Sequence, residues 1–154
     1  MAGAKRRERL GKYFRFFVIF FLLISAGCAT KEALKNASDE EELRARVVSY
    51  WNLKIDGEFN KSYEYEDPFY RKTVSVVNYI KGINAASVKW KHAEIRGIKR
   101  EAADVAEVDL SLRMEIMLPE REQARRVEQN FPLADRWVRL DGVWYHQPVN
   151  RSKR

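Results

Sequence analysis

Few side chains in this 154-residue sequence are of types that could carry out chemistry, and its two histidines are the first to consider. His92 lies in an alternating segment that is expected to form a strand to about Ile98, and Glu94 follows it on the same parity. A histidine beside a carboxylate can act as a general acid or base when its pKa is near the working pH. His92 and Glu94 are therefore a candidate pocket pair, and the alternative is a surface histidine without chemistry. No catalytic or metal-binding motif is recognisable elsewhere, and we predict neither a metal nor a cofactor.

The second histidine belongs to a C-terminal hairpin centred on Asp141-Gly142, which is a strong signal for a two-residue turn. Such a turn pairs Leu140 with Val143, and this apolar side of the hairpin is expected to meet the core. The residues on the other side are Trp137, Arg139, Trp144 and His146. Because tryptophan and arginine are enriched at interface hot spots, we predict that this side faces outward and contacts a partner. The alternative is a cross-strand ladder that only stabilises the sheet.

The only cysteine, Cys28, follows an N-terminal segment with the three parts of a secretory signal. Six basic residues precede an apolar run over 16–24, and the small residues 25–27 come next. This run is shorter than the roughly 20 residues that a membrane-spanning helix needs. We therefore expect cleavage before Cys28. An uncleaved anchor helix and a plain secretory signal are the alternatives.

The segment Ile24-Ser25-Ala26-Gly27-Cys28 resembles the bacterial lipobox, although Ser25 stands where that motif more often has leucine. The resemblance implies that Cys28 is lipidated and anchors the mature chain to a membrane on the periplasmic side. Ala29 after the cysteine resembles the signal for sorting to the outer membrane in a Gram-negative host. Lipidation would use the only thiol, which excludes disulfides and cysteine-based metal sites.

Removal of the signal changes the net charge of the chain. The whole sequence has 29 basic and 22 acidic residues and a net charge of +7. Residues 1–27 hold six of the basic residues and one of the acidic ones, which leaves 23 against 21 and a net charge of +2. A strongly basic domain would have suggested nucleic-acid binding, and that suggestion loses its main support.

The sequence divides into four regions, which are a signal peptide (1–27), a lipidated tether (28–37), a single domain (38–149) and a basic tail (150–154). The size of the third region suits one domain with its own core.

Three helical segments are expected at the start of the domain. A capping box at Ser38 opens the first, and an apolar stripe continues it to about 56–57. A second short helix should stop before Pro68, because the residue before a proline disfavours helical backbone angles. A third covers about 72–81, with Gly82 as its stop.

After these helices the apolar residues no longer recur at helical spacing but at every second position. The clearest strand is 105–118, with one apolar and one charged face, as in an antiparallel sheet packed on one side. Residues 119–130 are expected to be a charged connection, followed by hairpin strands over 136–140 and 143–147. Helices followed by a run of antiparallel strands indicate an α+β fold.

Two segments resemble the nuclear transport factor 2-like (NTF2-like, SnoaL-like) superfamily. They are the run from Tyr50-Trp51 through Asp56-Gly57-Glu58-Phe59 to Pro68, and the closing hairpin 137–145. The resemblance covers about residues 39–148 and implies a cone-shaped α+β roll around a pocket, often dimeric through its sheet. Some members are isomerases or dehydratases, but their catalytic sets match no residues of this chain one by one.

We therefore expect a lipid-anchored domain of the cell envelope that binds a partner protein or a second copy of itself, without enzymatic activity. The alternative is a small-ligand binder, or an isomerase- or dehydratase-like enzyme, that uses the interior of the cone.

Overall fold

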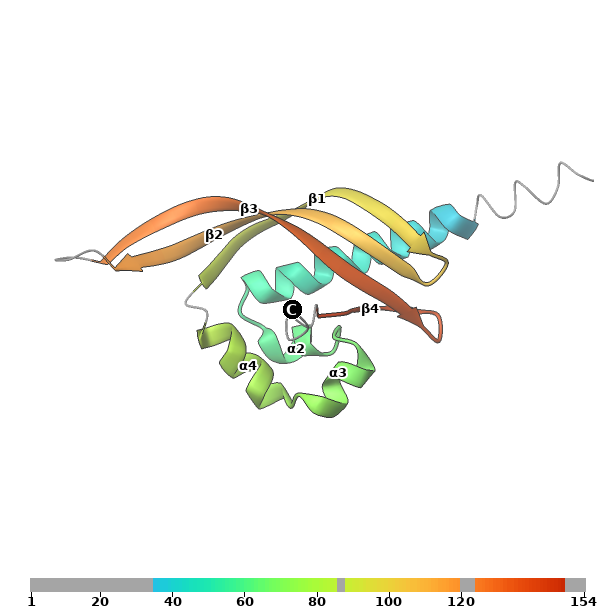
Figure 1. Ribbon diagram of the computed structural model, residues 1–154, viewed down its shortest axis with the longest axis horizontal. Coiled ribbons are helices and arrows are strands. Elements are labelled where there is room, and N and C mark those ends of the chain that lie inside the picture. Colours follow the sequence, from blue (N-terminus) through green and yellow to red (C-terminus); the bar gives the residue numbers. More distant parts are fainter. Residues whose placement is uncertain (1–34, 86–87, 120–123, 149–154) are drawn as a thin grey trace, which may run out of the picture. The chain divides into compact units, whose positions relative to one another are not determined.

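The computed structural model describes residues 35–85, 88–119 and 124–148 (Figure 1). The predicted signal with Cys28 and the predicted tail over 150–154 lie outside the described residues. The chain forms one compact unit up to Glu41 and another from Glu42 onward, and the packing described below is that of the second unit.

The first helix spans residues 35–55. Ser38 lies inside this helix, so the prediction that Ser38 caps its N-terminus is wrong. Lys35 and Ala37 are good helix formers, and they give the helix no reason to begin only at Ser38. The predicted apolar stripe is confirmed. Its buried residues are Leu43, Val47, Tyr50 and Trp51.

Three short helices follow, which are α2 (Phe59–Tyr63), α3 (Pro68–Thr73) and α4 (Val76–Ala85). The second helix ends before Pro68, as predicted. Pro68 then takes the first position of α3, where its missing N–H is tolerated, and Asp67 caps that helix by accepting a 2.8 Å hydrogen bond from the Phe69 N–H. The predicted stop at Gly82 is wrong, because α4 continues to Ala85. One glycine costs a helix only about 1 kcal/mol, which does not end it.

Four strands form one antiparallel sheet in the order β1-β2-β3-β4. Their bounds are Val88–Ala102 for β1, Val105–Pro119 for β2, Ala124–Leu140 for β3 and Val143–His146 for β4. The sheet is curved, and the first helix from Glu42 onward lies along its concave side (Figure 1). The fold is therefore α+β, as predicted.

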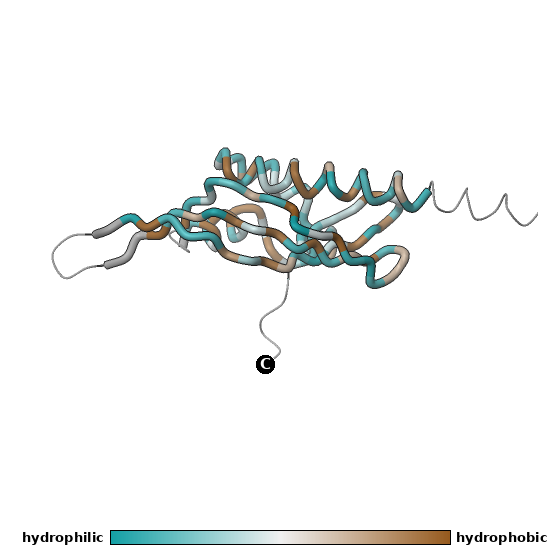
Figure 2. Tube along the Cα trace, turned by 90° about the horizontal axis from the view of Figure 1, so that it is seen from above, coloured by the Kyte–Doolittle hydropathy of each residue, from teal (hydrophilic) through white to brown (hydrophobic). Residues whose placement is uncertain are grey.

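The third strand is much longer than the sequence suggests. It begins at Ala124, so the prediction of a charged connection over 119–130 is wrong for the residues from 124 onward. Arg126 and Glu128 are exposed on either side of the half-buried Val127, so their charges belong to the outer face of a strand. The alternation of hydrophilic and hydrophobic residues along the strands can be followed in Figure 2.

The C-terminal hairpin has the predicted register. Leu140 pairs with Val143, and Trp137 pairs with His146. Asp141 and Gly142 form the turn with φ angles of 51° and 83°, which are the left-handed values that such a two-residue turn requires.

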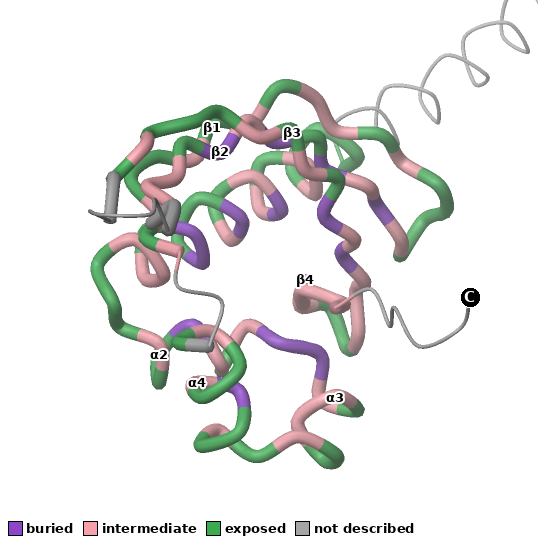
Figure 3. The backbone as a smooth tube through the Cα atoms, turned by 60° about the vertical axis from the view of Figure 1, so that its left-hand side comes forward, coloured by how far each residue is buried: buried purple, intermediate pink, exposed green. Residues whose placement is uncertain are grey.

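The core lies between the first helix and the concave face of the sheet, where the buried segments of both can be seen in Figure 3. The sheet contributes Ala106, Val108, Leu110, Leu112, Trp137 and Trp144. Two tryptophans without any exposed surface make the β3–β4 end of this core mainly aromatic.

The β1 edge of the sheet is irregular, and the short strand β4 at the other edge is covered. The register of β1 shifts at three places, and its exposed residues include Lys89, Lys91, Arg96 and Lys99. At the other edge, β4 has only four residues. The backbone of His146 bonds to the 65–67 segment, where its N–H donates to the Tyr65 carbonyl and its own carbonyl accepts from the Asp67 N–H, both at 2.8 Å. Arg46 donates to the Trp144 carbonyl.

We expect Gly142→Ala to lower the free energy of unfolding by about 1 kcal/mol, because alanine is strained at a φ of 83°. The matched control is Gly82→Ala, where an added Cβ meets no atom within 4 Å and the backbone is helical. This control should be neutral or stabilising, since alanine is the better helix former. Urea denaturation of both variants measures the difference, and equal effects would contradict the assigned turn.

Candidate functional site: a buried polar network

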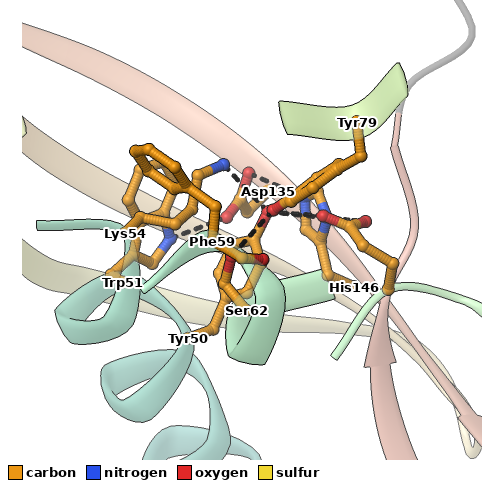
Figure 4. A network of polar contacts seen from close by, with 9 residues as sticks. Tyr50, Trp51, Lys54, Phe59, Ser62, Tyr79, Asp135 and His146 are labelled. Carbon is orange, nitrogen blue, oxygen red and sulfur yellow. Dashed lines mark hydrogen bonds and ion pairs between the residues drawn. The ribbon is translucent and has the colours of Figure 1, made fainter. Parts of the chain in front are cut away.

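Four separate segments bring polar side chains together at the centre of the domain (Figure 4). Tyr50, Trp51 and Lys54 come from the end of the first helix, Glu66 from the loop after α2, Asp135 from β3 and His146 from β4. Helical spacing places Tyr50 and Lys54 one turn apart on the same face. Glu66 and Asp135 are only 1% and 5% exposed, so their charges need partners inside the protein.

His146 lies between the two buried carboxylates. Its Nδ1 atom is 2.7 Å from Glu66 Oε2, and its Nε2 atom is 3.4 Å from Asp135 Oδ1. The second oxygen of each carboxylate is also bonded. Trp51 Nε1 donates to Asp135 Oδ2 at 2.9 Å, and the Tyr50 hydroxyl donates to Glu66 Oε1 at 2.8 Å. All four carboxylate oxygens are thus satisfied within the network.

Lys54 ends this series of hydrogen bonds. Its Nζ donates to the Tyr50 hydroxyl at 3.0 Å, so that hydroxyl accepts from Lys54 while it donates to Glu66. The Tyr50 ring also stacks on the imidazole of His146, with 4.8 Å between ring centroids. Beside the network, Ser62 donates to the Phe59 carbonyl, so Tyr79 is the donor in the 3.0 Å bond between the two hydroxyls.

The surroundings of His146 favour its protonated form. Burial alone would lower the pKa of His146, but the hydrogen bonds to Asp135 and Glu66, and their negative charges, outweigh it and raise the pKa to about 9. The imidazole is therefore a cation at neutral pH and donates from both nitrogens.

Burial is the largest influence on the pKa values of two further members of the network, Lys54 and Tyr50. It lowers the pKa of Lys54, although Glu66 and Asp135 favour the charged amine, and it raises the pKa of Tyr50 well above its ordinary value. The network thus brings two basic side chains, Lys54 and His146, together with the two carboxylates, and its members bond to one another.

The structure reverses one prediction about the hairpin. Trp137 and Trp144 were expected on an outer face, but both have 0% exposure and face the helix, so that prediction is wrong. The reason is the pairing of Trp137 with Ala106, which lies on the buried side of β2. The guanidinium of Arg139 lies 6.0 Å from the centroid of the Trp144 ring, and Arg139 also bonds to Glu42 at 3.4 Å.

His92 and Glu94 do not line the interior, so the prediction of a pocket pair is wrong in its placement. Both residues are exposed, and Glu94 forms an ion pair with Arg96 at 3.0 Å. The cause is the register shift between Trp90 and His92, which changes the parity of β1. Trp90 points inward and His92 outward.

Sequence reasoning missed most of the network. Of its six members only His146 was a candidate, and it was assigned to a different role. Glu66 has acidic neighbours that suggest solvent exposure, Asp135 stands in a mostly apolar segment, and the two are 69 positions apart in the chain. One signal was present. Tyr50, Trp51 and Lys54 lie on the predicted inner stripe of a helix, where a lysine requires a buried acceptor.

A cavity of about 740 Å³ lies outside this network, as an open groove. It is lined mainly by Asp67, Phe69, Tyr70, Val74, Arg136 and Gln147. Three of these follow a network residue directly in the chain, because Asp67 follows Glu66, Arg136 follows Asp135 and Gln147 follows His146. The groove and the network are thus built from the same three backbone segments.

Comparison with models of known protein families gives no match, and comparison with curated protein sequences gives none either. Among the described residues, no helix is long and apolar enough to cross a membrane. In that same part of the chain, no three or more His, Cys, Asp or Glu side chains gather in a way that could hold a metal ion.

We expect the protein to lose stability as the pH rises from about 6.5 to about 9. The pKa of His146 is about 9 in the folded chain against 6.5 for an unperturbed histidine, so the contribution is full below 6.5 and is lost above 9. This shift corresponds to as much as about 3 kcal/mol in the free energy of unfolding. Urea denaturation across this pH range measures it.

Two variants isolate the source of this pH dependence. His146→Gln should remove most of the slope, and His92→Gln should leave it unchanged, because His92 is exposed. A slope that survives in His146→Gln would show that His146 does not carry the stabilising proton.

Proposed function

We propose that this chain is a lipid-anchored protein of the cell envelope whose NTF2-like domain binds a partner protein. The lipobox-like segment ending at Cys28 supports the anchor and, with Ala29, an outer-membrane address on the periplasmic side. The sequence of elements, with helices first and then a curved antiparallel sheet over them, supports the NTF2-like assignment.

The observation that carries the binding role is the open groove of about 740 Å³ between α3 and the β3–β4 end of the sheet. This volume is in the range of about 300–1,000 Å³ that is usual for ligand sites. Phe69 lines the groove and is 64% exposed, the largest exposure among the large apolar side chains described. An exposed aromatic ring beside an arginine is a combination that partner proteins frequently contact.

Hydrogen bonds hold several of the residues that line the groove in place, and this supports the binding role. Arg136 donates to Gln147 Oε1 at 2.8 Å and to Glu101 Oε2 at 2.6 Å, so its guanidinium is held in one orientation. Asp67 is occupied as the cap of α3 and positions Phe69. The groove is thus preformed, which lowers the entropic cost of binding.

The anchor is tested by Cys28→Ser. We expect this variant to lose the lipid, because only a thiol forms the thioether, and to remain as uncleaved precursor. Metabolic labelling with a palmitate analogue and fractionation of the envelope measure the loss, and Cys28→Ala should behave in the same way. Labelling that persists in both variants would disprove the anchor.

The groove is tested by photo-crosslinking in intact cells. Phe69 is replaced by the photoreactive analogue p-benzoylphenylalanine, and the matched control carries the same analogue at Val77, which is 56% exposed on α4. We expect a discrete cross-linked product from position 69 and none from position 77. The mass of the product distinguishes a second copy of the chain from another envelope protein. The same product from both positions, or none from position 69, would refute the groove as the binding site.

A further inference from the structure

Three aromatic rings surround the amine of Lys54 as a cage. Its Nζ atom is 4.7 Å from the ring centroids of Tyr50 and Trp51, and 4.9 Å from that of Trp90. Two of these rings come from the first helix and one from β1. Phe59 of α2 supports the cage from outside, with its ring edge-on to Trp90 at 6.2 Å.

The cage also holds a polar partner for a cation. The Tyr50 hydroxyl accepts a hydrogen bond from Lys54 at 3.0 Å, and Glu66 and Asp135 favour positive charge at this position. Aromatic faces attract a cation through the negative charge of their π systems, and more strongly where water is excluded. Rings, a hydrogen-bond acceptor and nearby carboxylates are together the chemistry that recognises an organic ammonium ion.

We propose that this cage is a binding site for alkylammonium ions, which the chain fills with its own lysine. The ligand class follows from the occupant, because Lys54 is itself an amine on an unbranched apolar stem. Lys54 is half-buried as a residue. A free amine enters when the stem swings outward, and Lys54 acts as an intramolecular competitor. This proposal rests neither on the lipid anchor nor on the groove.

A simpler role for Lys54 would be to neutralise the two carboxylates without any selectivity of the cage for an amine. The two roles predict different ligands. A purely electrostatic site would accept potassium as readily as an organic cation. A site formed by hydrophobic packing alone would accept a neutral alcohol of the same size.

The test removes the Lys54 side chain and adds a free amine that has the same atoms. Lys54→Ala deletes the side chain beyond Cβ, and n-propylammonium supplies the same three carbons and the nitrogen. The fluorescence of Trp51 and Trp90 in the cage walls and the melting temperature are followed during titration. Lys54→Met is the matched control, because its unbranched side chain keeps the cage filled without charge.

We expect saturable binding of n-propylammonium to Lys54→Ala, with a rise in melting temperature. Binding should be at least about tenfold weaker for n-propanol, for potassium chloride and for the Lys54→Met variant, as a cation–π contribution of about 1.4 kcal/mol requires. Equal responses to the amine and the alcohol, or no saturable response in a folded variant, would overturn the proposal.

A measurement on the unaltered chain decides the matter if Lys54→Ala does not fold. The Nζ atom of Lys54 lies within 5 Å of three ring centroids, so the resonances of the neighbouring Cε protons should be shifted upfield by ring currents relative to exposed lysines such as Lys99. Ordinary lysine shifts for Lys54 would show that the cage does not hold the amine, and the proposal would fail.

Discussion

The imidazolium of His146, held between Glu66 and Asp135, is the interaction on which the remaining structure depends. It joins β4 to β3 through Asp135, to the loop after α2 through Glu66, and to the first helix through the Tyr50 hydroxyl. A buried carboxylate without a partner is expensive, and breaking a buried ion pair from one side costs about 3–5 kcal/mol. Each of the two carboxylates therefore requires the histidine, and the histidine requires both. Removal of any one of the three would leave a charge inside the core.

The contacts of His146 also attach a terminal strand that is short. Four residues of β4 provide few ladder hydrogen bonds. The side chain of His146 adds two contacts to carboxylates, and its backbone bonds to Tyr65 and Asp67 at 2.8 Å. These contacts in turn position Gln147, which accepts a hydrogen bond from Arg136 in the groove. The position of Arg136 in the groove is thus linked, through Gln147, to the contacts of His146 with the buried carboxylates.

Local sequence patterns predicted much of the fold. The stripe of the first helix, the alternation of β2 and the turn at Asp141-Gly142 depend on neighbouring residues, and all three are confirmed. The wrong predictions concern residues whose orientation depends on a partner far away in the sequence. The face of Trp137 depends on its pairing with Ala106, 31 positions earlier in the chain, and this pairing cannot be seen within the hairpin itself.

The candidate site was predictable only in part, for two physical reasons. A β-bulge changes the parity of a strand without a strong sequence signal, and one such shift moved His92 from the expected interior to the surface. Buried acids also resemble exposed ones in sequence. Glu66 follows a run of polar and aromatic residues. Its partner His146 lies on β4, 80 positions later in the chain, so the pair is visible only in the folded structure.

The irregular first strand and the covered last strand have a consequence for assembly. An unpaired, regular strand edge exposes a row of amide groups to which another chain can add, which leads to open-ended fibres. Here three register shifts and basic side chains interrupt the β1 edge, while the 65–67 segment and Arg46 occupy β4. β4 pairs only with Trp137–Leu140, so among the described residues no strand lies beside β3 between 124 and 135 on that side. Addition of another strand is therefore disfavoured at β1 and at β4, but not along this part of β3.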